Sequence, residues 1–395
     1  MISFDEAFAK IAAIARPFGE EDIVLAHANG RILAKDIVAR SNAPFYDVSA
    51  MDGYGVKDKD IAALPARLPV TRESFAGSPM PDALKDGECI RIFTGAPVPQ
   101  GVDRVVIQEN VTREDDIAII SEAQTGKPNI RKSGSDFHAG DTLLSQGDQL
   151  NWRKMTAAAA ADRDHVSVYR RIKAVVLTTG DELKAPGQAH LTPGAIPESV
   201  SYGVAAFLSE NGVDVLRTQR LVDDLDTLKA SANEALADAD LVVVTGGASV
   251  GERDYAKAMF EDHAPEQVFS KVAMKPGKPV WLSKVRRSYV MGLPGNPSSA
   301  LVTARLLLQP LVFGLSGLTP EAALAFEEVT CLDDLPQGGD REEFMRARRT
   351  PDGITICASQ DSGSQITLAD ANILIRRPPN APAVKAGGKA LAISF

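Results

Sequence analysis

Three apolar runs, each ending in glycine, limit the possible folds of this chain most strongly. They read IKAVVLTTG (172–180), LVVVTGG (241–247) and SYVMGLPG (288–295). Continuous apolar runs of this kind are typical of parallel strands that are buried on both faces. Between them, apolar residues recur at helical spacing over 200–208 and 225–236. The sequence therefore predicts a doubly wound α/β domain over residues 171–317.

The rest of the chain divides around this domain, which makes the protein a multidomain α/β and β protein. Residues 42–138 are rich in Gly and Pro and contain short β-type runs such as CIRIFTG, which favours a small β domain. Helical patterns flank it, so we expect 1–41 and 139–170 to form one helical linking or dimerisation domain into which the β domain is inserted. Residues 318–395 alternate β-type runs with tight turns and predict a C-terminal β-barrel, with a sandwich as the alternative.

Charge and composition narrow the classes of partner. The 395 residues carry a formal net charge of −9, so we expect no nucleic acid and no membrane among the partners. The N-terminus has no basic leader and no apolar run near the ~20 residues that a membrane span needs. Ser3 and Glu6 instead predict the capping box of an amphipathic helix. Cys89, Cys331 and Cys357 are odd in number and far apart, which fits a reducing compartment, and we expect a cytoplasmic protein.

Three glycine-containing loops should meet at one edge of the α/β sheet. They are TTGDEL (178–183), TGGASVGERDY (245–255) and GLPGNPSSA (292–300). Ligands of open α/β sheets bind outside the carboxyl ends of the strands, and glycine loops and helix N-termini present backbone N–H groups to anions. We therefore expect a phosphate or pyrophosphate there, although ordinary tight turns are the alternative for any single loop. The loops supply these candidate substrate-binding residues: Gly246, Gly247, Ser249, Asn296 and Ser299.

A stiff lysine loop could supply positive charge for such an anion. In MKPGKPVW (274–281), Lys275 and Lys278 bracket a Pro-Gly turn in which prolines restrict the backbone. Together with Lys271 they could form a local positive site on an acidic protein. Solvated surface lysines are the alternative interpretation.

Carboxylates at the same edge of the sheet are candidate metal ligands. Asp181 and Glu182 follow the first strand, Asp223 and Asp224 precede a helix, and Asp254 follows the second glycine loop. Mg²⁺ prefers oxygen ligands and usually keeps several waters, so few protein ligands are needed. Alternatively, Asp224 and Asp254 are acids at helix N-termini, where the helix dipole favours them.

Other enzyme classes fit the sequence less well. Residues 247–251 match the G-x-S-x-G nucleophile elbow, but His263 is the one later histidine and lies too close in the chain to return from another strand. The P-loop and dinucleotide fingerprints are absent. A serine hydrolase and the common nucleotide-binding enzymes are therefore not favoured.

Six motifs taken together resemble one family. SAMDGYGV (49–56), RIFTGAPVPQG (91–101), TTGDEL, TGGASVGERDY, MKPGKP and GLPGNP occur in this order over nearly 300 residues. This pattern resembles the MoeA type of molybdopterin molybdenumtransferase, which includes the E domain of gephyrin. The resemblance covers essentially the whole chain and implies an elongated homodimer of four-domain subunits with a shared active site.

The resemblance also implies a reaction and the residues that perform it. Members insert molybdate into adenylylated molybdopterin, release AMP and form the molybdenum cofactor with the help of Mg²⁺. The implied catalytic residues are Asp52, Glu182, Asp224, Asp254 and Lys275, of which Glu182, Asp224 and Asp254 would bind the metal. The implied substrate-binding residues are Thr94, Asp136, Lys271, Lys278, Pro294 and Pro297, besides those of the glycine loops. Implied protein partners are the molybdopterin adenylyltransferase and enzymes that accept the cofactor.

Two motifs depart from the family pattern and keep alternatives open. PESV (197–200) stands where the family commonly has Tyr-Asp-Ser/Thr-Asn, so Glu198 and Val200 replace Asp and Asn and could cost a polar contact to the ligand. Gly134-Ser135-Asp136 replaces Gly-Glu-Asp, with one carboxylate fewer. The alternatives are the related molybdopterin adenylyltransferase, whose single domain resembles 171–317, and a non-catalytic scaffold of the same fold.

Overall fold

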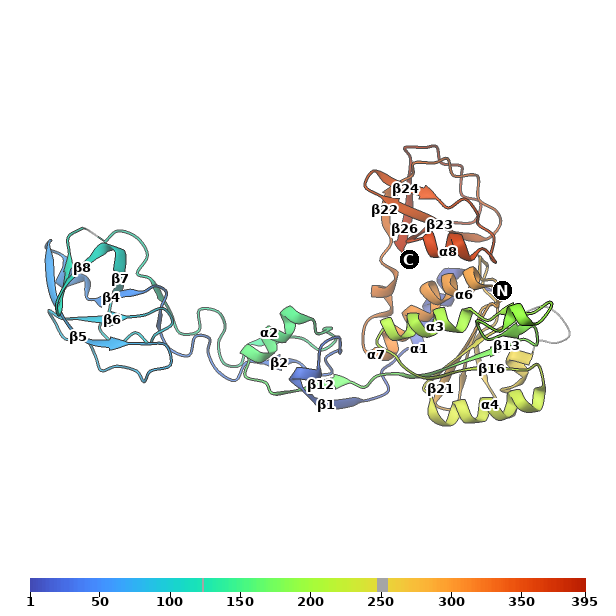
Figure 1. Cartoon of the computed structure of the whole chain (residues 1–395), viewed down its shortest axis with the longest axis horizontal. Coiled ribbons are helices and arrows are strands. Elements are labelled where there is room, and N and C mark those ends of the chain that lie inside the picture. The colour runs from blue at the N-terminus through green and yellow to red at the C-terminus, as the bar shows by residue number, and fades with distance from the viewer. Residues whose placement is uncertain (123, 247–254) are drawn as a thin grey trace.

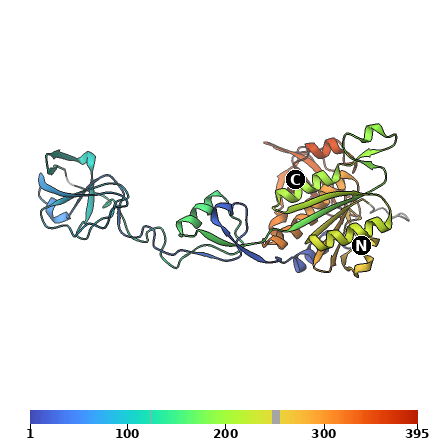
Figure 2. The same ribbon diagram turned by 60° about the horizontal axis from the view of Figure 1, so that its bottom comes forward.

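The computed structural model describes residues 1–122, 124–246 and 255–395. The molecule is elongated and bent (Figure 1). A small β domain lies at one end of the molecule. Two segments of the chain, here called the two-chain connection, run side by side from it to a linking domain, which leads to the α/β domain. The C-terminal domain projects from the α/β domain at an angle. The small β domain is equally separate from the α/β domain after a 60° turn (Figure 2), so the two are truly far apart.

Six strands form the central sheet in the order β16-β13-β17-β21-β20-β18. Their bounds are Lys173–Thr179 for β13, Asp214–Leu221 for β16, Leu241–Thr245 for β17, Glu266–Phe269 for β18, Trp281–Val285 for β20 and Ser288–Leu293 for β21. The first four strands in this order are parallel, and β20 and β18 are antiparallel additions. The three apolar runs are the neighbouring strands β13, β17 and β21, which confirms the predicted doubly wound domain.

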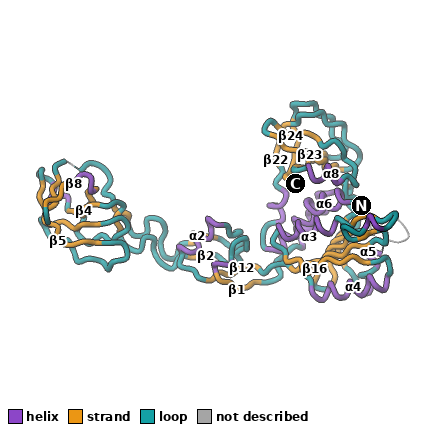
Figure 3. The backbone as a smooth tube through the Cα atoms, viewed as in Figure 1, coloured by secondary structure: helices purple, strands orange, loops and turns teal. Residues whose placement is uncertain are grey.

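Both faces of this sheet are buried, which explains why the apolar runs are continuous. Val176 and Val243 face a core that includes helices α3 (Val200–Glu210) and α6 (Pro297–Thr303). Val175 and Val244 face the opposite core, which includes α4 (Leu225–Asp238). Figure 3 shows α3 and α6 on one side of the sheet and α4 on the other. Each fully buried valine contributes about 1.5–3 kcal/mol relative to an exposed one.

The longest apolar helical run lies in the α/β core. It continues from α6 through a short π-helix at Ala304–Leu308 into α7 (Gln309–Ser316). Among the described residues, Pro297–Ser316 alone is long and apolar enough to cross a membrane, but 78% of its most apolar window is buried inside the molecule. Its leucines pack in the same core as α3, so it is a core helix of the fold.

Helix α1 (Phe4–Ile14) begins with the predicted capping box. The Glu6 N–H donates to Ser3 Oγ at 3.1 Å, and the Ser3 N–H donates to Glu6 Oε2 at 2.7 Å. The helix packs in the α/β core, however, whereas the predicted division assigned residues 1–41 to the linking domain. Its C-cap residue Ala15 lies so close to α7 that a Cβ on Gly314 would be 2.4 Å from the Ala15 Cβ. The apolar face of α1 thus finds its partner in α7.

The linking domain, predicted to be helical, is mixed. It has one α-helix among its described residues, α2 (Trp152–Ala160), and two two-stranded antiparallel sheets. In these sheets β1 (Glu20–Val24) pairs with β12 (His165–Tyr169), and β2 (Ile37–Val38) pairs with β11 (Thr142–Leu144). In β12 exposed or half-buried residues alternate with buried ones. Strands this short give a weak periodic signal beside an Ala-rich helix, so the helix dominated the prediction.

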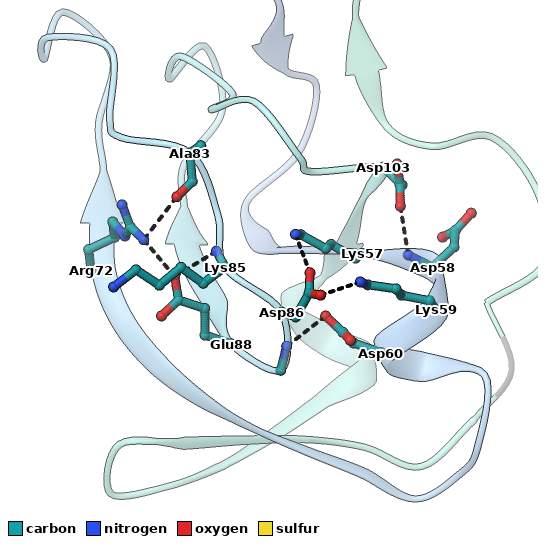
Figure 4. Close-up of polar contacts among 11 residues, drawn as sticks. Lys57, Asp58, Lys59, Asp60, Arg72, Ala83, Lys85, Asp86, Glu88 and Asp103 are labelled. Carbon is teal, nitrogen blue, oxygen red and sulfur yellow. Dashed lines mark hydrogen bonds and ion pairs between the residues drawn. The ribbon is translucent and has the colours of Figure 1, made fainter.

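The small β domain contains a six-stranded sheet in the order β7-β4-β6-β5-β9-β8. Their bounds are Gly53–Val56 for β4, Ala66–Ser74 for β5, Cys89–Ile92 for β6, Arg104–Ile107 for β7, Val111–Glu114 for β8 and Ile117–Ile120 for β9. Ion pairs fasten the loop before β6 to a short helix after β4 (Figure 4): Asp86 accepts from Lys57 at 2.6 Å and from Lys59 at 2.5 Å. The backbone N–H of Gly87 also donates to Asp60 at 3.0 Å. Charged and polar contacts therefore help to hold this loop.

The C-terminal domain is a β-sheet domain joined to the α/β domain through a shared strand. The sheet has the order β19-β23-β25-β26-β22, and β24 pairs with β23. The bounds are Met274–Lys275 for β19, Glu327–Thr330 for β22, Glu342–Thr350 for β23, Gly353–Ile356 for β24, Ile373–Arg377 for β25 and Lys389–Ser394 for β26. Because β19 belongs to the lysine loop of the α/β domain, its parallel pairing with β23 holds the two domains together.

Candidate active site

A cleft opens at the carboxyl ends of the central strands. The chain leaves β13 to form β16 on one side and then forms β17 on the other, so the strand order reverses between β13 and β17. Ligands of open α/β folds bind at such a switch. The cleft has a volume of about 720 Å³. Its lining combines the predicted loops with part of the C-terminal domain: Thr178, Thr179, Gly180, Glu182, Leu183, Ile196, Pro197, Glu198, Ser199, Val200, Asp223, Thr245, Gly246, Pro279, Pro294, Gly295, Asn296, Pro297, Ser299, Gly363 and Gln365.

Bare backbone forms the floor of this cleft. Gly246 has a φ of +87°, and a Cβ at this position would lie 2.3 Å from the carbonyl oxygen of Thr179. A Cβ on Gly295 would lie 3.4 Å from the Cα of Gly246, so the third loop also approaches closely. Beneath them, the buried hydroxyls of Thr178 and Thr245 are hydrogen bonded at 2.9 Å. Thr245 and Gly246, the described start of the second loop, therefore meet the other two loops in a form that lets backbone approach an anion.

Three carboxylates line the cleft among the described residues: Glu182, Asp223 and Glu198. Glu198 is buried, so Glu182 and Asp223 are the candidates for binding a ligand. Glu182 is exposed and folds back over Gly180, where a Cβ would lie 2.9 Å from Glu182 Oε2. The other is Asp223, whose backbone N–H donates to Asp181 Oδ1 at 3.1 Å. The loop after β13 and the loop before α4 thus bring oxygen donors to one cleft.

Asp224, the predicted metal ligand next to Asp223, caps helix α4 instead. Its Oδ1 accepts from the backbone N–H of Thr227 at 2.9 Å and from the Thr227 hydroxyl at 2.6 Å. These two hydrogen bonds lower the pKa of Asp224. Asp224 is therefore the N-cap of α4 and does not line the cleft. This agrees with the alternative interpretation of the sequence, in which Asp224 is an acid at a helix N-terminus.

The segment PESV (197–200), which departs from the family pattern, leads into α3 and lines the cleft. Glu198 is 5% exposed and accepts from the Ser201 N–H at 2.8 Å and from the Ser201 hydroxyl at 2.6 Å. Val200 is 8% exposed and packs in the α/β core. Both substituted residues therefore have structural partners of their own within the protein.

The loop after β21 contributes its predicted residues to the cleft. Pro294, Asn296, Pro297 and Ser299 all line it, and Pro297 occupies the first turn of α6 as expected for a helix start. The side-chain amide of Asn296 donates to Ser362 Oγ at 2.9 Å. The N-terminus of α6 therefore faces the cleft.

Sequence reasoning missed a loop of the C-terminal domain that completes the cleft. Gly363 and Gln365 line it, and Ser298 of α6 bonds to this loop through its backbone N–H and its hydroxyl, to carbonyl oxygens 3.1 and 3.0 Å away. Arg346, only 1% exposed, anchors the loop by donating to the carbonyl oxygens of Ser359 and Asp361 at 3.0 and 2.8 Å. The loop lies beyond the last of the six motifs and has no glycine-rich pattern that signals a ligand.

None of the predicted lysines, Lys271, Lys275 and Lys278, lines the cleft. Lys275 Nζ forms an ion pair with Glu343 Oε1 at 3.1 Å, next to the β19–β23 pairing. Lys271 and Lys278 are exposed, and Pro279, which follows Lys278, lines the cleft. The turn therefore contacts the cleft through its proline.

Asp52 and Thr94 lie together in the small β domain. Asp52 Oδ1 accepts from the Thr94 N–H at 2.7 Å and from the Thr94 hydroxyl at 2.8 Å. The hydrogen bond from the Thr94 N–H contributes most to lowering the pKa of Asp52, followed by the one from the Thr94 hydroxyl. The positive charge of Arg91 lowers this pKa further. Asp136 is exposed near the two-chain connection, where its N–H donates to the Ala43 carbonyl at 3.0 Å. Within one chain this domain is far from the α/β domain that holds the cleft (Figures 1 and 2).

Three predicted site residues, Gly247, Ser249 and Asp254, lie outside the described residues. In the described part of the chain, no group of three or more His, Cys, Asp or Glu side chains is arranged to hold a metal ion. Of the predicted metal ligands, Glu182 is thus the one that the described cleft contains.

Comparisons with known proteins identify related sequences over the whole chain. Three family models match in succession: the MoeA N-terminal region (domain I and II) over residues 2–161, a probable molybdopterin binding domain over 175–330, and the MoeA C-terminal region (domain IV) over 328–395. Two solved structures of the molybdopterin biosynthesis MoeA protein from Pyrococcus horikoshii have TM-scores of 0.86 and 0.85, at 26% and 23% identity. Both cover 100% of this chain, which covers 99% and 100% of theirs.

Curated relatives are more similar in sequence. The molybdopterin molybdenumtransferase of Haemophilus influenzae is 38% identical over 319 residues, which span 80% of this chain and 78% of the relative. The protein of the same name from a Nostoc species is 34% identical over 382 residues, 93% of this chain and 87% of the relative. This chain therefore belongs to the MoeA family of molybdopterin molybdenumtransferases.

Proposed function

We propose that this chain is a molybdopterin molybdenumtransferase, which inserts molybdate into adenylylated molybdopterin, releases AMP and so forms the molybdenum cofactor. The observation that carries the proposal is the cleft at the strand-order switch, which is lined by residues of three glycine loops, Thr245 and Gly246 among them, and by the N-terminus of α6. Its volume of about 720 Å³ lies within the range of small-molecule sites. Curated relatives with this name match most of the chain and support the same reaction.

The chemistry of the reaction explains why such a cleft suits it. Molybdate and the phosphoanhydride of the adenylylated pterin are both anionic, so preorganised N–H groups and cations lower the barrier by neutralising charge. Gly246 and Gly295 allow close approach of backbone, and Asn296 and Ser299 add side-chain donors. In this proposal Lys275, Lys278 and Lys271 raise the local positive potential for the incoming anions.

Mg²⁺ fits the donor set that the cleft offers. Magnesium usually binds one or two carboxylates, waters and substrate phosphates, so it does not need a cage of protein ligands. Glu182 would be its ligand from the described cleft, with Asp254 as the other proposed ligand. Asp224, the third predicted ligand, caps α4 and does not line the cleft. Bound there, the ion would neutralise charge on the phosphoanhydride.

The proposal includes a homodimer with shared active sites. Asp52 and Thr94 form a hydrogen-bonded pair in the small β domain, which lies far from the α/β domain, so one chain cannot bring them to its own cleft in this conformation. A second copy related by two-fold symmetry would supply them, and Asp136, to its partner's cleft. Residues on both domains then act on one substrate.

Other parts of the proposal concern organisation and setting. We divide the chain into a linking domain (1–41 with 139–170), an inserted β domain (42–138), the α/β domain (171–317) and the C-terminal domain (318–395), with α1 packed on the α/β domain as described above. We place the protein in the cytoplasm, which is supported by three free cysteines. Its protein partners would be the adenylyltransferase that supplies the substrate and enzymes that accept the cofactor.

A single reconstitution separates this proposal from its alternatives. Purified protein is incubated with adenylylated molybdopterin, molybdate and Mg²⁺, and AMP release and cofactor formation are measured. We expect both products to depend on molybdate. An adenylyltransferase would instead form adenylylated pterin from molybdopterin and ATP, and a scaffold protein would form neither.

A further inference from the structure

Arg91 lies in a row of stacked side chains in the small β domain. Its guanidinium carbon is 4.9 Å from the centre of the Tyr54 ring and 4.6 Å from that of Phe93. Phe93 in turn stacks on Phe75, with ring centres 4.7 Å apart and an interplanar angle of 11°. The sheet creates this row, because Tyr54 and Arg91 are partners in the β4–β6 pairing and Phe93 bonds to the end of β5. Contacts with these two rings limit the movement of the guanidinium.

The same guanidinium fastens the backbone on one side of Asp52. Arg91 Nη1 donates to the carbonyl oxygen of Gly53, the next residue after Asp52, at 3.1 Å. Arg91 Nη2 donates to Gln108 Oε1 at 2.7 Å, and the Gln108 N–H donates to the carbonyl oxygen of Asp52 at 3.0 Å. Two connections therefore lead from Arg91 to the turn that presents the Asp52 carboxylate.

Thr94 is connected to Arg91 as well. It directly follows Phe93, whose ring lies between the guanidinium and Phe75. Thr94 provides both hydrogen bonds to the Asp52 carboxylate, from its N–H and from its hydroxyl. Arg91 therefore supports the donor and the acceptor of this pair from one point.

We propose that Arg91 is a positioning residue, which holds Asp52 and Thr94 in the arrangement that the transfer reaction needs. The inference rests on the proposed function, because it assumes that Asp52 acts on the substrate. Arg91 is suited to this task by its planar fork, which donates in two directions while two aromatic rings contact it. A lysine would keep the charge but would lose the fork and the stacking, and small displacements of a reacting group are costly to rate.

The test compares four variants of the full-length protein. Arg91→Lys keeps the charge, and Arg91→Gln removes it. Arg67→Gln is the matched control, because Arg67 lies in the same domain and pairs with Glu114 at the surface. Asp52→Ala is the reference for loss of the carboxylate. Each protein is assayed for kcat and KM in the reconstitution above, and hydrogen exchange at the Thr94 amide is followed with the thermal midpoint.

We expect kcat to fall by about tenfold to a hundredfold in both Arg91 variants, the scale of a misplaced reacting group. KM should change little, exchange at the Thr94 amide should accelerate, and Arg67→Gln should behave as wild type. Wild-type kcat and unchanged Thr94 exchange in Arg91→Lys, with Asp52→Ala inactive, would overturn this inference and leave the proposed function intact. Full activity of Asp52→Ala would instead overturn the role of Asp52 and the inference with it. If Arg91→Gln does not fold, Arg91→Lys alone decides.

Discussion

Glu198 accepts two hydrogen bonds from Ser201, one from its backbone N–H at 2.8 Å and one from its hydroxyl at 2.6 Å. Glu198 is 5% exposed, so its carboxylate binds the first turn of α3 instead of water. We expect Glu198→Ala to lower the free energy of unfolding by about 1–3 kcal/mol, because the Ser201 donors lose their partner in a buried setting. Urea unfolding measures this change. Glu210→Ala, at the exposed end of the same helix, is the control and should change stability by less than about 0.5 kcal/mol.

The second prediction concerns Glu182 in the cleft. We expect Glu182→Ala to lower kcat by about a hundredfold, the usual loss when one electrostatic group of an active site is removed. The Mg²⁺ concentration for half-maximal activity should rise, and stability should stay the same because the side chain is exposed. Glu234→Ala on the exposed face of α4 provides the control. Wild-type kcat and Mg²⁺ dependence in Glu182→Ala would remove this residue from the site.

The third prediction tests whether two subunits share a site. Asp52→Ala and Glu182→Ala subunits are mixed, and exchange is verified by mass. If Asp52 acts on its partner's cleft, each heterodimer contains one intact site, and random pairing should restore roughly a quarter of full activity. If both residues acted within one subunit, every site would stay damaged and the mixture would remain inactive.

The fourth prediction concerns the ion pair that joins the linking domain to the α/β domain. Arg170 donates to both carboxylate oxygens of Asp240 at 2.8 Å, and the Lys173 N–H donates to Asp240 at 3.0 Å. Burial raises the pKa of Asp240, but these bonds and the nearby positive charges outweigh it and lower the pKa. Because the folded pKa is depressed, the stabilisation is present above the unfolded pKa of about 3.9 and is lost as the pH falls through the folded pKa.

Asp240→Asn should therefore destabilise the protein by about 2 kcal/mol at neutral pH, below the ~3–5 kcal/mol of a fully buried pair because Arg170 is 32% exposed. The difference from wild type should shrink below about pH 4. Denaturant unfolding at several pH values measures both effects. Asp238→Asn, which breaks the more exposed pair with Arg217, should have a small effect at every pH. A difference that stays constant down to pH 2 would contradict the assignment.

The local features of the fold could be predicted because each depends on neighbouring residues. Ser3 and Glu6 predicted the α1 cap, and Pro297 predicted the start of α6. Apolar runs that end in glycine predicted the parallel strands, because a strand buried on both faces has no polar alternation. The partner of α1 could not be predicted in this way, because α7 lies almost 300 residues further along the chain.

The candidate site likewise combines features that local sequence predicts with features that depend on contacts between distant residues. The sequence by itself determined the glycine loops, Glu182 and the start of α6, because conformational freedom at glycine and restriction at proline are properties of the residues themselves. Tertiary structure alone decided that Asp223 lines the cleft while Asp224 caps α4, since one residue along the backbone reverses the direction of the side chain. It also brought Gly363 and Gln365 to the cleft and set the small β domain, which contains Asp52 and Thr94, far from the α/β domain. These positions depend on how domains pack, and the contacts between domains join residues that no local pattern links.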